Sequence, residues 1–75
     1  SMPISEKLDT MINEFLVYGN KKYANDDIKR NQIIDLYNMK ENCKNEKKGN
    51  DGIIPTEGEI MYLIYYLRWN KILPF

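Results

Sequence analysis

The sequence predicts a small all-α domain of three to four helices with one long flexible loop. Apolar residues recur at helical spacing in three separate segments. Between the second and third segments, residues 41–52 are dense in asparagine, lysine and glycine, which is typical of a mobile loop. Seventy-five residues can bury only one hydrophobic core, so we expect a single domain over residues 2–75. Ser1 before Met2 is typical of a residue left by tag removal, and we expect the native chain to start at Met2.

The first helix is expected over residues 5–18. Ser5 is a suitable N-cap because its hydroxyl can accept a hydrogen bond from a backbone N–H of the first turn. Gly19 is expected to end the helix by taking a left-handed conformation. One apolar stripe then consists of Ile4, Leu8, Met11, Ile12, Phe15 and Leu16.

The second helix is expected to follow a polar connector over residues 19–24. Asn25 is the predicted N-cap, and the first turn then carries two aspartates next to the positive end of the helix dipole. The apolar pattern stops at Lys40, so we expect the helix to end near there. Its apolar positions are Ile33, Ile34, Leu36 and Tyr37, together with Met39 and Ile28.

The third helix has the sharpest start signal, because Thr56 and Glu59 have the T-x-x-E spacing of a capping box. Pro74 limits how far the helix can extend. One apolar row consists of Ile60, Leu63, Ile64 and Leu67, and further apolar or aromatic positions on other faces are Met61, Tyr62, Tyr65, Tyr66 and Trp69. Three short helices cannot bury all of this apolar surface, and the part that stays exposed favours a docked partner. Alternatively, Tyr62, Tyr65 and Trp69 fill the core with their polar tips in water.

The composition argues against an enzyme. The chain has no histidine, the commonest general base and metal ligand. It has no glycine-rich phosphate loop, and one cysteine alone cannot form a zinc site. The acidic pairs at 26–27 and 57–59 lie at predicted helix starts, where capping explains them. We therefore expect no catalytic residues, no metal and no cofactor.

Charge and cysteine content also restrict the partners and the compartment. Eleven basic and eleven acidic residues give a net charge of zero, which speaks against nucleic acid as a partner. No apolar run is long enough to insert into a membrane. Cys43 is the only cysteine, so no internal disulfide can form, and a reducing, cytoplasmic setting is expected.

The segment 33–74 resembles an EF-hand of the calmodulin superfamily with an enlarged loop. The segment 33–38 is similar to the end of an entering helix, with Asn38 where the first loop ligand would stand. The segment 51–56, DGIIPT, is similar to the D-G-x-I half of the loop, and Glu59 onward to the exiting helix. Calcium needs a tight 12-residue ring of oxygen ligands that ends in a bidentate glutamate. Here 13 residues separate Asn38 from Gly52, and Gly58 occupies the glutamate position, so no calcium binding is expected.

Among calmodulin-like proteins that have lost calcium ligation, the chain most resembles myosin light chains, in particular the N-terminal lobe of the essential light chains of apicomplexan motors. The resemblance implies a lobe that binds and stiffens the lever-arm helix of a myosin heavy chain by helix-in-groove recognition. It also implies a second lobe beyond Phe75. The candidate lining, each member of which could equally belong to the core, is Met11, Phe15, Met39, Met61, Tyr65, Leu67, Trp69 and Phe75.

Two other interpretations remain open. A three-helix, helix-turn-helix-type nucleic-acid-binding domain is the first, although the third helix offers only Arg68, Asn70 and Lys71, at its far end, for contacts with bases. An oligomerisation domain is the second, and an isolated lobe could itself form a dimer, including by exchange of helices.

Overall fold

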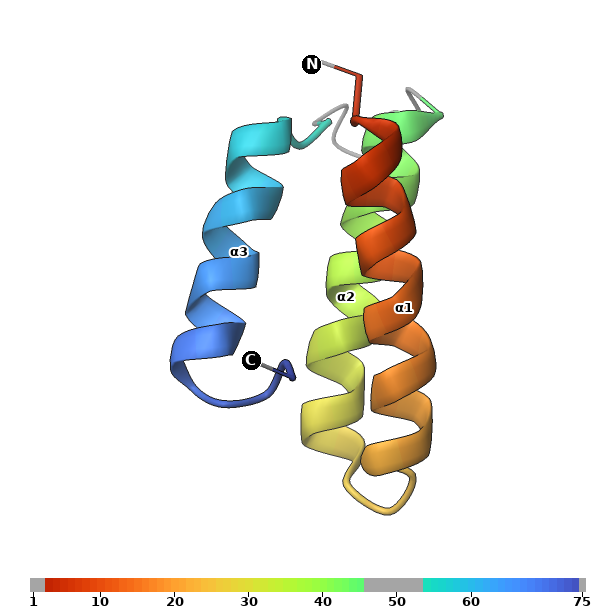
Figure 1. Ribbon diagram of the computed structural model, residues 1–75, viewed down its shortest axis with the longest axis vertical. Helices are drawn as coiled ribbons and strands as arrows, with labels where there is room; N and C mark the ends of the chain where they lie inside the picture. Colours follow the sequence, from red (N-terminus) through yellow and green to blue (C-terminus); the bar gives the residue numbers. More distant parts are fainter. Residues whose placement is uncertain (1–2, 46–53, 75) are drawn as a thin grey trace.

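The computed structural model describes residues 3–45 and 54–74 and contains three α-helices in these ranges. They are α1 (Glu6–Lys22), α2 (Asp27–Lys44) and α3 (Glu57–Trp69). Helices α1 and α2 form an antiparallel hairpin, and α3 runs antiparallel to α2 along its side (Figure 1). The described ranges contain no strand, so the expected all-α class is confirmed.

One stripe of each helix builds a shared core. Apolar residues three or four positions apart lie on one face of a helix, which is why each stripe points inward. The buried side chains are Leu8, Ile12 and Phe15 from α1, Ile33, Leu36 and Cys43 from α2, and Ile60, Ile64 and Leu67 from α3, with Tyr23, Ile72 and Leu73 from the connecting segments. Helix α2 lies between the other two and packs against both.

Helix α1 starts as predicted, because the Ser5 hydroxyl accepts a hydrogen bond from the Leu8 N–H. The prediction that Gly19 ends this helix is wrong. The helix continues to Lys22, and Gly19 is buried within it. A Cβ atom at position 19 would lie 2.6 Å from Ile33 Cδ1, so the glycine allows the two helices to approach closely. Its role is therefore in packing rather than in chain reversal.

Helix α2 differs from prediction at both ends. Its N-cap is Asp26 rather than Asn25, since the Asp26 carboxylate accepts from the Lys29 N–H. The helix also continues past Lys40 to Lys44, because Cys43 extends the buried stripe by another turn. The first four residues of the predicted loop 41–52 are thus helical, and residues 46–52 lie outside the described ranges. Asn38, the position that resembles a first calcium ligand, lies inside the helix.

Helix α3 begins with the predicted capping box, in which Thr56 and Glu59 each bond the backbone N–H of the other. It ends five residues before Pro74. Lys71 takes a left-handed conformation with φ 60°. The Lys71 N–H donates to the Arg68 carbonyl, and the Ile72 N–H donates to the Leu67 carbonyl. These two bonds form a Schellman motif, which turns the chain back so that Ile72 and Leu73 are buried.

Candidate interaction surface on helix three

Helix α3 has two unlike faces. Its inner face packs against α2, while four aromatic side chains on its outer side remain in solvent. Positions 62, 65, 66 and 69 are spaced by three, four and seven, so they share one side of the helix. Their exposed fractions are 74% for Tyr62, 57% for Tyr65, 50% for Tyr66 and 87% for Trp69. We call these four residues the aromatic face.

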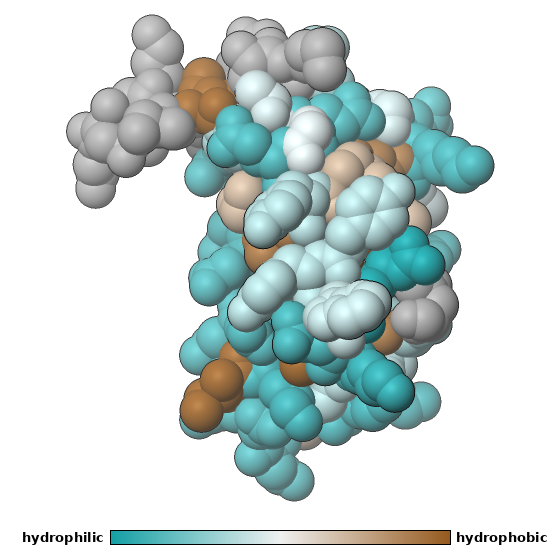
Figure 2. Space-filling view, turned by 90° about the vertical axis from the view of Figure 1, so that its left-hand side faces the viewer, coloured by the Kyte–Doolittle hydropathy of each residue, from teal (hydrophilic) through white to brown (hydrophobic). Residues whose placement is uncertain are grey.

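The aromatic face is large for a domain of this size. An aromatic side chain carries roughly 150–250 Å² of surface, so at the exposures above the four rings present on the order of 500 Å². Figure 2 looks onto this side of the molecule, where side chains of intermediate hydropathy, the pale ones, gather over α3. Patches of this size on a single chain are often binding surfaces.

Charged groups flank the aromatic face at its two ends. Glu57 and Glu59 lie in the first turn of α3, and Arg68 lies in the last turn. The Arg68 guanidinium carbon is 5.6 Å from the centre of the Tyr65 ring, a cation–π geometry. The Asn70 side chain donates to the Tyr66 carbonyl at 2.9 Å. The surface is thus aromatic in the middle, acidic at its start and basic at its end.

The seven predicted lining residues that the structure describes divide into three groups. Tyr65 and Trp69 lie on the aromatic face. Phe15 and Leu67 are fully inside the core, where a partner could reach them only if the helices separated. The three methionines are partly buried against the core, and they are Met11, Met39 and Met61. Phe75 lies outside the described residues. The structure therefore brings two of the eight together on one exposed surface.

Tyr62 and Tyr66 belong to the aromatic face but were not among the predicted lining residues. Their spacing to Tyr65 and Trp69 was available as a signal, because positions 62, 66 and 69 follow the i, i+4, i+7 pattern. The sequence alone could not show which side of α3 faces α2. That choice depends on the packing of Ile60, Ile64 and Leu67.

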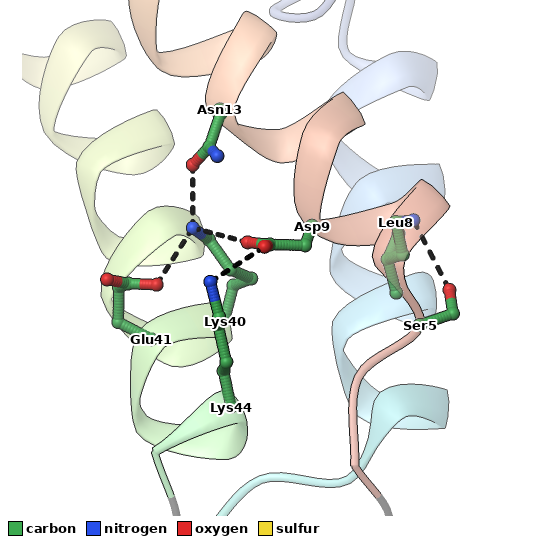
Figure 3. A network of polar contacts seen from close by, with 7 residues as sticks. All are labelled: Ser5, Leu8, Asp9, Asn13, Lys40, Glu41 and Lys44. Atoms are coloured by element: carbon green, nitrogen blue, oxygen red, sulfur yellow. Dashed lines mark hydrogen bonds and ion pairs between the residues drawn. The ribbon is translucent and has the colours of Figure 1, made fainter.

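A second polar cluster joins α1 to α2, and Figure 3 shows it around the Lys40 ammonium. Lys40 is 1% exposed, and its Nζ lies 2.8 Å from Asp9 Oδ1 and 2.9 Å from Glu41 Oε2. The same ammonium donates to Asn13 Oδ1 at 2.6 Å. Lys44 completes the cluster, with its Nζ 2.9 Å from Asp9 Oδ2. Two cations thus face two carboxylates.

The pKa shifts in this cluster follow from these contacts. Hydrogen bonds from Lys40 and then Lys44 lower the pKa of Asp9 below its ordinary value of 3.8. Burial opposes the charge on Lys40, but its bonds to Asp9 and Glu41 outweigh burial and raise its pKa above 10.5. Asp9, Lys40 and Lys44 are therefore charged at neutral pH, and none of the three is poised to exchange a proton. We assign the cluster to holding α1 against α2 rather than to catalysis.

Other kinds of site find little support in the described part of the chain. Residues 3–45 and 54–74 contain no group of three or more histidine, cysteine, aspartate or glutamate side chains that could hold a metal ion. No helix in these ranges is long and apolar enough to cross a membrane. A shallow open hollow runs along α1 and is lined by Glu6, Lys7, Thr10, Met11 and Glu14. All of the described residues that line it belong to α1.

Over residues 3–45 and 54–74, the fold and the aromatic face define a small three-helix domain with one exposed aromatic helix surface. Comparisons with models of protein families, with curated proteins and with solved structures gave no match.

Proposed function

We propose that this chain is a non-enzymatic protein-binding module that holds an amphipathic helix of a partner protein against the aromatic face of α3. The observation that carries the proposal is that four neighbouring aromatic side chains on one side of α3 stay at least half exposed. Tryptophan and tyrosine supply large, rigid contact area, and both are enriched among residues that dominate binding energy.

The chemistry of this face suits a helix as partner. A helix that binds in this way presents apolar anchors at i, i+3, i+4 and i+7. The aromatic face has the same periodicity, so two such stripes can pack along their length. Tyrosine hydroxyls at the margin can bond polar groups on the partner, which a purely aliphatic stripe could not do.

The resemblance to degenerate EF-hand light chains supplies a specific partner, the lever-arm helix of a myosin heavy chain. Under this form of the proposal the chain is the N-terminal lobe of a calmodulin-like light chain, it binds without calcium, and binding stiffens the heavy-chain helix. Met61 is partly buried on α3 beside the aromatic face and adds adaptable apolar contact at the edge of this surface.

A calorimetric titration tests both levels of the proposal. The wild-type chain is titrated with a peptide of a myosin light-chain-binding helix, and with a second peptide of the same composition whose order is scrambled to remove the helical periodicity. We expect saturable binding of the first peptide, no binding of the second, and no change on adding calcium. A calcium-dependent signal would contradict the light-chain form, and equal heats from both peptides would contradict helix recognition altogether.

Matched variants then locate the surface. Trp69→Ala should weaken binding at least about tenfold, as expected for a large, exposed aromatic anchor. Ile28→Ala and Val17→Ala are the controls, because these side chains are also large, apolar and exposed, 77% and 69%, but lie on α2 and α1. Their affinities should stay within about twofold of wild type. Equal losses in all three variants would rule out α3 as the binding surface.

A further inference from the structure

We infer that, in the absence of its partner helix, the aromatic face binds a second copy of this chain, with the two α3 helices antiparallel about a twofold axis. This inference rests on the proposed function insofar as both use the same face. It adds the identity of one occupant and the register in which that occupant binds.

Gly58 lies at a position where a side chain of another molecule could approach the backbone of α3 closely. Gly58 is exposed in the first turn of α3, and among the described residues a Cβ atom there would meet only the Thr56 hydroxyl, at 3.8 Å. Among residues 3–45 and 54–74, then, nothing requires a glycine at this position, although glycine costs a helix interior up to about 1 kcal/mol relative to alanine. This contrasts with Gly19, where Ile33 lies against the missing side chain.

The position of Gly58 matches that of Trp69. The two residues are eleven positions apart, which is close to three helical turns, so they lie on the same side of α3 at opposite ends of the aromatic face. Antiparallel pairing about a point between Leu63 and Ile64 places Trp69 of each copy over Gly58 of the other. A twofold interface repeats every contact, so the Trp69 indole of one copy lies over Gly58 of the other at both ends of the interface.

Charge and area agree with the same arrangement. Glu57 and Arg68 are also eleven positions apart, so they lie on the same flank of α3. In an antiparallel pair related by a twofold axis, this flank of one helix lies beside the same flank of the other. Glu57 of each copy therefore lies near Arg68 of the other. Each copy contributes on the order of 500 Å² of exposed aromatic surface, so these residues bury at most about 1,000 Å² in the pair, the lower limit for a specific interface. A dimer of moderate affinity is expected, which a tighter-binding partner helix would displace.

Sedimentation equilibrium over a wide concentration range tests the inference. We expect the mass of the wild-type chain to rise from one chain to two. Gly58→Gln should weaken the dimer at least about tenfold, since its side chain fills the space assigned to Trp69, without loss of thermal stability. Asn20→Gln, on the exposed side of α1, is the control and should dimerise like wild type.

A double variant tests the register. If Trp69 lies over Gly58 of the other copy, the penalties of Gly58→Gln and Trp69→Ala overlap, and the double variant dimerises no worse than Trp69→Ala alone. Additive penalties would overturn the antiparallel register, and a wild-type chain that stays monomeric at every concentration would overturn the inference. In the latter case, intact binding of the helical peptide would leave the proposed function standing. Dimerisation without binding of the helical peptide would support the inferred dimer and contradict the proposed function.

Discussion

Gly19 of α1 lies directly against Ile33 of α2, so closely that an added methyl group would sit 2.6 Å from Ile33 Cδ1 and 3.3 Å from its Cβ. This contact sets how near the two helices of the hairpin can come. Because Ile33 is fully buried, it has little room to move aside.

Gly19→Ala should therefore destabilise the domain although alanine is the better helix former. We expect a loss of about 1 kcal/mol in the free energy of unfolding, measured by urea denaturation, because overpacking outweighs the helix propensity gained. Gly58→Ala is the matched control, and because the nearest described atom would be the Thr56 hydroxyl at an ordinary 3.8 Å, the same substitution should stabilise by up to about 1 kcal/mol. Adding Ile33→Val, which removes Cδ1, should reduce the penalty at Gly19. Equal effects at the two glycines would contradict the close approach.

Lys40 should contribute far more to stability than its neighbour Lys44. Replacing Lys40 by alanine leaves Asp9 with one cation fewer and opens space in a buried site, at a cost of about 3 kcal/mol. Lys44 is 49% exposed, so solvent screens its ion pair and Lys44→Ala should cost much less than Lys40→Ala. Urea denaturation of the two variants at neutral pH makes the comparison. Similar losses in both would mean that Lys40 is not held as described.

The lowered pKa of Asp9 predicts a loss of stability in acid. A carboxylate whose folded-state pKa lies below the unfolded value stabilises the fold fully above the unfolded value, here 3.8, and loses that contribution as the pH falls through the folded-state pKa. The difference in melting temperature between wild type and Asp9→Asn should thus be largest at neutral pH and shrink below 3.8. A difference that does not change with pH would show that the charge on Asp9 is unimportant.

Lys71 is strained by its left-handed conformation at the end of α3. With φ at 60°, it occupies a position that glycine adopts without a Cβ clash. Lys71→Gly should raise the free energy of unfolding by about 0.5 kcal/mol, whereas Lys71→Val should lower it by more than about 1 kcal/mol. Thermal unfolding followed by circular dichroism makes both measurements. If glycine and valine act alike, the turn does not have this geometry in solution.

Local signals and distant packing explain which features the sequence could predict. Ser5 and Thr56 were identified correctly as caps because an N-cap acts on residues three positions away, which a sequence displays directly. Gly19 was misinterpreted because its role depends on Ile33, which lies fourteen residues later in the chain and in a different helix. A glycine near a helix end is compatible with either a stop or a close approach.

The end of α2 was placed too early for a similar reason. Lysine at position 40 interrupts the apolar pattern, yet positions 33, 36, 40 and 43 continue one stripe. Lys40 occupies a core position because Asp9, from α1, neutralises it there. A polar residue in register with a core stripe, followed by Cys43, was the signal that the helix continues. Likewise, the aromatic content of α3 was evident, but its exposure depended on which face α2 covers.

Trp69 gives the most direct test of the central claim, that the aromatic face of α3 binds a partner helix. It is the only tryptophan and is 87% exposed, so its fluorescence reports on this surface alone. At a concentration where the chain is monomeric, adding the light-chain-binding helix peptide, made without tryptophan, should shift the Trp69 emission to shorter wavelength, saturably, and protect it from acrylamide quenching. An emission maximum and a quenching constant that stay unchanged throughout the titration would contradict the claim.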